Sequence, residues 1–66
     1  MEFIEKAKVR IDHWINHNEA HIEEYETFAG QLEEEGKKES AGYIREMAEL
    51  TAKSTESLRN AIKALE

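Results

Sequence analysis

The chain has 66 residues with no cysteine and no proline, and 36% of its residues are charged, with a formal net charge of -6. The length allows one small domain. The missing cysteines exclude disulfides, thiolate zinc sites and cysteine nucleophiles, and the negative charge disfavours nucleic acid as a partner. No apolar run approaches the roughly 20 residues of a membrane span and no signal peptide is recognisable, so we expect a cytoplasmic protein with no membrane partner.

Residues 2–35 are predicted to form the first helix. Their apolar positions recur every seven residues in two series, which together give one stripe along a helix. The first series is Ile4, Ile11, Asn18, Tyr25 and Leu32; the second is Ala7, Trp14, His21 and Phe28; and Ile15, Ile22 and Ala29 widen the stripe. Gly36 is the residue type that best closes a helix, so we expect a turn over residues 36–37.

Residues 38–65 are predicted to form the second helix. One series is Ile44, Thr51, Leu58 and Leu65; the other is Met47, Ser54 and Ala61; and Ala41, Ala48 and Ile62 lie beside them. Leu32 and Ile44 are twelve residues apart, which is not a multiple of seven, so one continuous helix would rotate the second stripe away from the first. A turn removes this mismatch. The sequence therefore predicts an all-α, antiparallel two-helix hairpin as a single domain over residues 1–66.

Tyr43 and Leu50 make the apolar arc of the second helix wider than one neighbouring helix can cover. The chain has no third helix to cover the remainder. Two hairpins that associate into an antiparallel four-helix bundle would bury it. We therefore expect a homodimer, with a helix of another protein as the alternative partner.

Four polar residues interrupt the two stripes at one level of the hairpin. If the chain turns near Gly36, Asn18 lies opposite Ser54 and His21 lies opposite Thr51. A buried polar group without a partner costs about 1 to 3 kcal/mol, so we expect these four residues to form a hydrogen-bonded layer in the core. On one interpretation this layer fixes the register and the oligomeric state, as a buried asparagine does in coiled coils.

On the second interpretation the histidines form a metal site. His13, His17 and His21 are spaced by four residues and share one side of a helix. Neutral imidazole is the commonest protein ligand of nickel, cobalt, zinc and copper, and His17 with His21 is the strongest chelating pair, with Glu24 within reach. A di-iron enzyme is disfavoured, because it needs Glu followed three residues later by His on facing helices, and the second helix has no histidine.

Three stretches are distinctive: His-Trp-Ile-Asn-His-Asn-Glu-Ala-His at 13–21, Glu-Glu-Tyr at 23–25, and Ile-Arg-Glu-Met-Ala-Glu-Leu-Thr at 44–51. Together they resemble a group of small, uncharacterised two-helix proteins of prokaryotes. The distinctive part is Trp-Ile-x-His-Asn-x-x-His, and the likeness covers nearly the whole chain. The resemblance implies a helical hairpin and directs attention to His17, Asn18 and His21, but it implies no activity.

These observations favour a small non-enzymatic interaction or assembly protein, homodimeric, with a histidine-based site for a divalent metal. We assign no catalytic residue, because the sequence has no phosphate-binding glycine loop and no nucleophile with a base and an orienting acid. The alternative is a dedicated transition-metal module that binds nickel, cobalt, zinc or copper through His13, His17 and His21.

Overall fold

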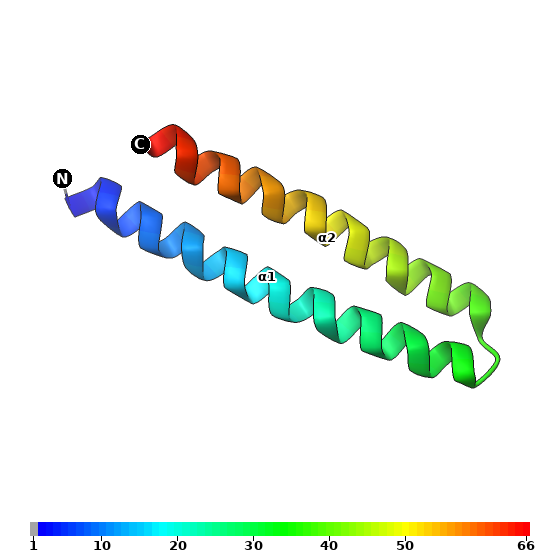
Figure 1. Cartoon of the computed structure of the whole chain (residues 1–66). Coiled ribbons are helices and arrows are strands. Elements are labelled where there is room, and N and C mark those ends of the chain that lie inside the picture. The colour runs from blue at the N-terminus through cyan, green and yellow to red at the C-terminus, as the bar shows by residue number, and fades with distance from the viewer. Residues whose placement is uncertain (1) are drawn as a thin grey trace.

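The computed structural model describes residues 2–66 and consists of two long helices packed side by side, α1 (Glu2–Glu34) and α2 (Lys38–Leu65) (Figure 1). The helices run antiparallel, so both chain ends lie at the same end of a rod whose Cα atoms span 53 × 14 × 10 Å. The prediction of an all-α hairpin is confirmed. Of the expected domain over residues 1–66, residue 1 lies outside the described part, and α1 ends one residue earlier than expected.

The turn between the helices is built around Gly36, as predicted. Gly36 has a φ of 80°, a left-handed conformation that glycine adopts without steric cost. Its N–H donates to the carbonyl of Glu33 at 3.0 Å, and the N–H of Lys37 donates to the carbonyl of Leu32 at 2.9 Å. These two bonds form a Schellman motif, which satisfies carbonyls that the end of α1 would otherwise leave unpaired. The motif ends α1 and lets α2 begin at Lys38, two residues after Gly36.

The contact between the helices, which we call the seam, is lined by residues spaced alternately by three and four. Five of its side chains are buried: Ile15 and Ala29 on α1, and Ala41, Ala48 and Thr55 on α2. Half-buried residues complete it: Ile11, Asn18, Ile22, Tyr25 and Leu32 on α1, and Ile44, Thr51, Leu58, Ile62 and Leu65 on α2. Three of the five buried residues are alanines. Small side chains let two helix backbones approach closely, so the hairpin core is thin.

One predicted heptad series on each helix, that of Ile11 and that of Ile44, lies in the seam, whereas the second series on each helix lies one position outside it. Three positions expected in the seam, at Trp14, Phe28 and Met47, are exposed, while the neighbouring positions Ile15, Ala29 and Ala48 are buried. The apolar stripes are wide enough for either choice. The helices approach through their smaller residues, and the larger side chains then lie on the outside.

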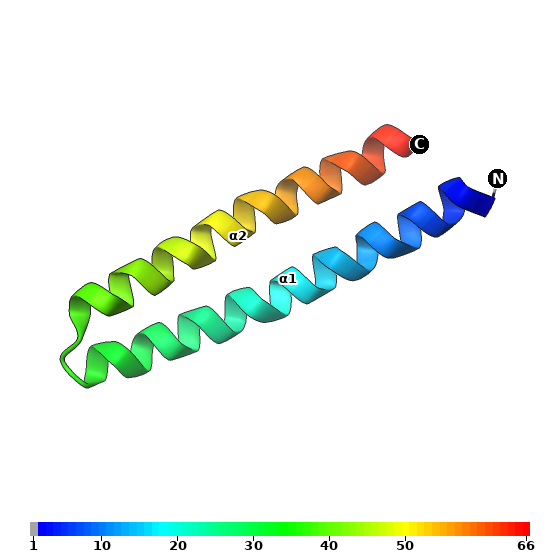
Figure 2. The ribbon, with the colours of Figure 1, turned by 180° about the vertical axis from the view of Figure 1, so that it is seen from behind.

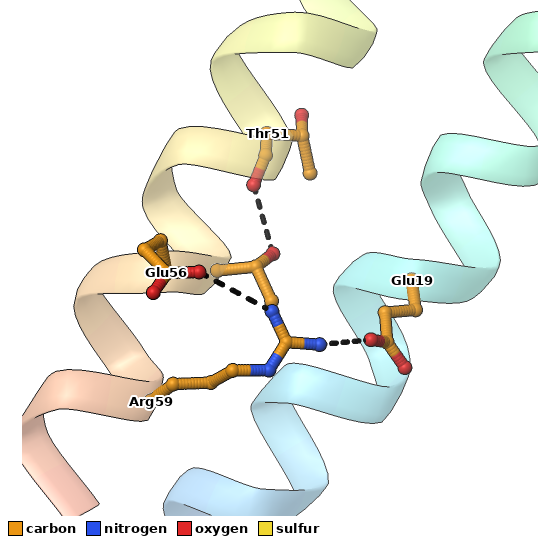
Figure 3. Close-up of polar contacts among 5 residues, drawn as sticks. Glu19, Thr51, Glu56 and Arg59 are labelled. Atoms are coloured by element: carbon orange, nitrogen blue, oxygen red, sulfur yellow. Dashed lines mark hydrogen bonds and ion pairs between the residues drawn. The ribbon is translucent and has the colours of Figure 1, made fainter. Parts of the chain in front are cut away.

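Charged residues occupy one of the two flanks of the seam. Arg45 donates to the carboxylate of Glu33 at 2.9 Å. Arg59 donates to the carboxylate of Glu19 (Figure 3), so each of the two bonds joins α2 to α1. Arg59 also lies 3.8 Å from Glu56 on its own helix. Seen from behind, the two helices remain side by side over their whole length (Figure 2). Within residues 2–66, no helix combines the length and apolar character needed to cross a membrane.

Candidate functional site

The flank opposite the ion pairs carries the large exposed side chains. On α1, Trp14, His21 and Phe28 are seven residues apart, and each lies on the other side of the seam from Glu19 and Glu33. On α2, Met47 lies two residues after Arg45, and Ala61 lies two residues after Arg59. Two residues correspond to about 200° around a helix, so these side chains lie on the flank away from the arginines. We call these six residues the aromatic side: Trp14, His21, Phe28, Met47, Ser54 and Ala61.

No Lys, Arg, Asp or Glu occurs at the six positions of the aromatic side. Trp14 is 46% exposed and Phe28 is 50% exposed, so about half of each large ring remains open in the single chain. Tyr43 and Leu50, which lie along its edge on α2, are more exposed still. Apart from His21 and Ser54, this flank therefore carries apolar side chains that the hairpin leaves partly exposed.

The total exposed area gives a scale for this surface. The chain exposes 5186 Å². A folded monomer of 7.7 kDa is expected to expose about 4,300 Å² from the usual scaling of surface with mass. The surplus is about 850 Å², close to the roughly 800 Å² that each partner contributes to a stable protein interface. The exposed area of the hairpin thus exceeds the area expected for a monomer of its mass by about the area that one partner contributes to an interface.

The predicted polar layer is only partly present in the core. Asn18, His21 and Thr51 are half-buried, whereas Ser54 is exposed on the aromatic side. The buried polar residue of α2 is Thr55, because the series of Ser54 lies one position outside the seam. The spacing of seven from Ala41 through Ala48 to position 55 was the signal in the sequence that could have identified it.

The threonines of this layer are satisfied within their own helix. The hydroxyl of Thr55 donates to the carbonyl of Thr51 at 2.8 Å (Figure 3), and the hydroxyl of Thr51 donates to that of Met47 at 2.9 Å. Among residues 2–66, no buried side-chain nitrogen or oxygen lacks a partner. Back-bonding of this kind removes the cost of burying a hydroxyl without requiring a partner across the seam.

The three histidines lie along α1 beside the aromatic side, unevenly spaced. The ring centroids of His17 and His21 are 4.4 Å apart in an edge-to-face arrangement, whereas His13 and His17 are 6.2 Å apart. The ring of His21 stacks near Tyr25 with centroids 6.0 Å apart, and its Nδ1 lies 3.1 Å from the Oε1 atom of Glu24. The structure thus brings His17, His21 and Glu24 together and leaves His13 apart.

A single chain does not assemble a full set of metal ligands. In the described part of the chain, no group of three or more His, Cys, Asp or Glu side chains is placed to hold one ion. Structural and catalytic zinc sites use at least three protein ligands. His17 and His21 are therefore two candidate ligands, fewer than such a site uses.

Comparison with known proteins gives one match. The model of a family described as a domain of unknown function (DUF8180) matches residues 7–65. This region includes the seam, the turn, the aromatic side and all three histidines. No curated protein and no solved structure shows a significant match to the chain.

Proposed function

The chain belongs to the DUF8180 family, and we propose that it is a non-enzymatic assembly protein that forms a homodimer through its aromatic side. The observation that carries this proposal is the uncovered flank, on which Trp14 and Phe28 are about half exposed, in a chain whose total exposed area exceeds the expectation for its mass by about 850 Å². Two hairpins joined through this flank make a four-helix bundle with the aromatic residues inside.

The thin core of the hairpin supports the same proposal. Of the five buried residues, three are alanines and one is a threonine, so Ile15 is the large apolar residue among them. A chain of 66 residues with so little buried apolar surface and no cysteine lacks the usual sources of stability of small domains. Association would bury Trp14 and Phe28 and provide the missing apolar contact.

We infer that the partner is a second copy, because large and small residues of the α2 flank are offset along its length. Large residues occur in its first half, at Tyr43 and Met47, and small ones in its second half, at Ser57 and Ala61. When two copies of α2 meet antiparallel, the large residues of one face the small residues of the other. Alternating large and small residues across an interface lets the layers interdigitate.

The test is the mass of the particle in solution. Size exclusion coupled to light scattering, performed across the micromolar range in EDTA, is expected to give about twice the chain mass of 7.7 kDa at the upper end. Circular dichroism should show helicity that falls on dilution. A compact particle of one chain's mass with a cooperative, concentration-independent melt would overturn the proposal.

The alternative function is a dedicated module that binds nickel, cobalt, zinc or copper through His13, His17 and His21. The observation that favours it is the 4.4 Å distance between the ring centroids of His17 and His21. It requires His13 to act with the other two in one chain. Calorimetric titration distinguishes the candidates, because this module predicts that His13→Ala loses as much metal affinity as His21→Ala does.

Both candidates operate in the cytoplasm in our proposal. Small secreted domains are typically stabilised by several disulfides, and this chain has no cysteine. Neither candidate involves catalysis by the chain's own residues.

A further inference from the structure

His21 lies at the centre of the aromatic side on α1. Trp14 is seven residues before it and Phe28 is seven residues after it, and the two rings are almost equally exposed, at 46% and 50%. A twofold axis that passes beside His21 would therefore place Trp14 of one copy against Phe28 of the other. The same axis would bring the two copies of His21 together.

The level of His21 on α2 falls between two members of the aromatic side, Met47 and Ser54. Met47 and Ser54, a large and a small residue, are symmetric about the point between Leu50 and Thr51. Residues equally far from Gly36 are level in the hairpin, because both helices rise by about 1.5 Å per residue. His21 is fifteen residues before Gly36 and Thr51 is fifteen after it. One axis therefore serves both helices, and α1 packs antiparallel on its symmetry mate.

From this geometry we propose that His17 and His21 of two copies form one site for a divalent transition metal on the twofold axis of the dimer. The proposal rests on the dimer described above. His17 lies one turn from His21, with ring centroids 4.4 Å apart, so a pair of imidazoles comes from each chain. Four imidazoles supply the ligands that one chain does not assemble, in a number that suits tetrahedral zinc.

Glu24 fixes the orientation of the central ligand. Its carboxylate Oε1 lies 3.1 Å from the Nδ1 atom of His21, so Nδ1–H donates to Glu24 and the Nε2 atom is left as the acceptor that binds a metal. A carboxylate on the distal nitrogen of a ligating histidine holds its tautomer and ring orientation, and its removal typically lowers metal affinity by about 10- to 100-fold. Glu24 is therefore a positioning residue of this site.

His13 provides the internal control. Its ring lies 6.2 Å from that of His17, it is exposed, and it is eight residues, or about 80° around the helix, from His21. It faces away from the twofold axis. The proposed site therefore divides the three histidines into two ligands and one bystander, which the sequence spacing alone does not.

The experiment uses Zn²⁺ as the probe and sedimentation equilibrium as the readout. With free Zn²⁺ at a hundred times the dissociation constant of the site, the dimer dissociation constant should fall by about 100-fold relative to EDTA. Native mass spectrometry should find one zinc per two chains. Each variant is compared with itself in EDTA and with zinc. Zinc should no longer tighten the dimers of His17→Ala and His21→Ala, whatever their dissociation constants in EDTA, whereas it should tighten His13→Ala as it does the wild type.

Glu24→Gln tests the positioning role separately. It should lower the zinc affinity of the dimer by about 10- to 100-fold while leaving the dissociation constant in EDTA unchanged. A Glu23→Gln variant, at the adjacent exposed position, is the matched control and should behave as the wild type does.

The outcomes separate this inference from the proposed function. A dimer in EDTA that binds one zinc per chain, or that does not tighten with zinc, keeps the proposed function and overturns the metal site. Equal loss on His13→Ala also overturns it, because the ligands would then be a ladder on one chain. A chain that is monomeric both in EDTA and with zinc overturns both.

Discussion

Truncation of Phe28 is the sharpest test of the aromatic side. An accessible phenylalanine has about 200 Å² of surface, of which 50% is exposed in the hairpin, so dimerisation can bury about 100 Å² on each chain. At about 25 cal/mol per Å², this burial contributes about 2.5 kcal/mol per chain and about 5 kcal/mol per dimer. The remaining Cβ and incomplete burial at the interface reduce the value to roughly half. We therefore expect Phe28→Ala to raise the dimer dissociation constant by about 100-fold.

The assay is sedimentation equilibrium in EDTA, with circular dichroism at high concentration to establish that the variant is helical. Val9→Ala is the matched control, because Val9 is 71% exposed but lies five residues before Trp14, about 140° around the helix, away from the aromatic side. Its dissociation constant should equal that of the wild type. A helical Phe28→Ala variant with unchanged affinity, or an equal effect at Val9, would refute the assignment of the interface.

The remaining predictions concern the two flanks and the seam. Ser54→Glu places a charge in the proposed interface and should leave a monomer by light scattering, whereas Asn60→Glu, on the outward face of α2, should leave the dimer intact. Leu58→Ala, half-buried in the seam, should lower the free energy of unfolding by about 2 to 5 kcal/mol in chemical denaturation. Arg59→Gln removes the ion pair with Glu19 and should change that free energy by less than about 1 kcal/mol, because both side chains are about half exposed.

The two helices and their connection were predictable because each depends on local chemistry. Gly36 has a left-handed backbone conformation, which other residues adopt only with strain. It also lies between two helical patterns of different phase, and this difference in phase required a turn. Both helices are also free of proline and rich in good helix formers. These signals lie in the sequence itself and need no knowledge of what packs where.

The phase of the seam was not predictable in the same way. The heptad pattern favoured Trp14 and Phe28 as core residues, because they are larger and more apolar than Ala29 or Ala48. In one hairpin the smaller residues lie between the helices, and the aromatic residues are half exposed. A stripe that must cover two neighbours has two edges, and a single sequence does not say which edge belongs to the same chain.

The candidate site follows the same division. The approach of His17 to His21 follows from helical spacing, and so does the contact of His21 with Glu24 three residues later. The exchange of Ser54 for Thr55 in the buried layer depends on the phase of the seam and was predicted wrongly. Spacing along one helix could be read from the sequence, and so could the series of Ile11 and Ile44 in the seam, but the choice between the two edges of each stripe could not.

The position of the small residues explains why folding and assembly belong together in this chain. Alanines and a back-bonded threonine in the seam let α1 and α2 approach closely, but they bury little apolar surface. The same choice turns Trp14 and Phe28 onto the open flank, where their burial depends on a second chain. The hairpin geometry is thus set by the small side chains, while in the proposed dimer the burial of Trp14 and Phe28 follows only on association. In that proposal a metal on His21, at the centre of the flank, would couple its own binding to both steps.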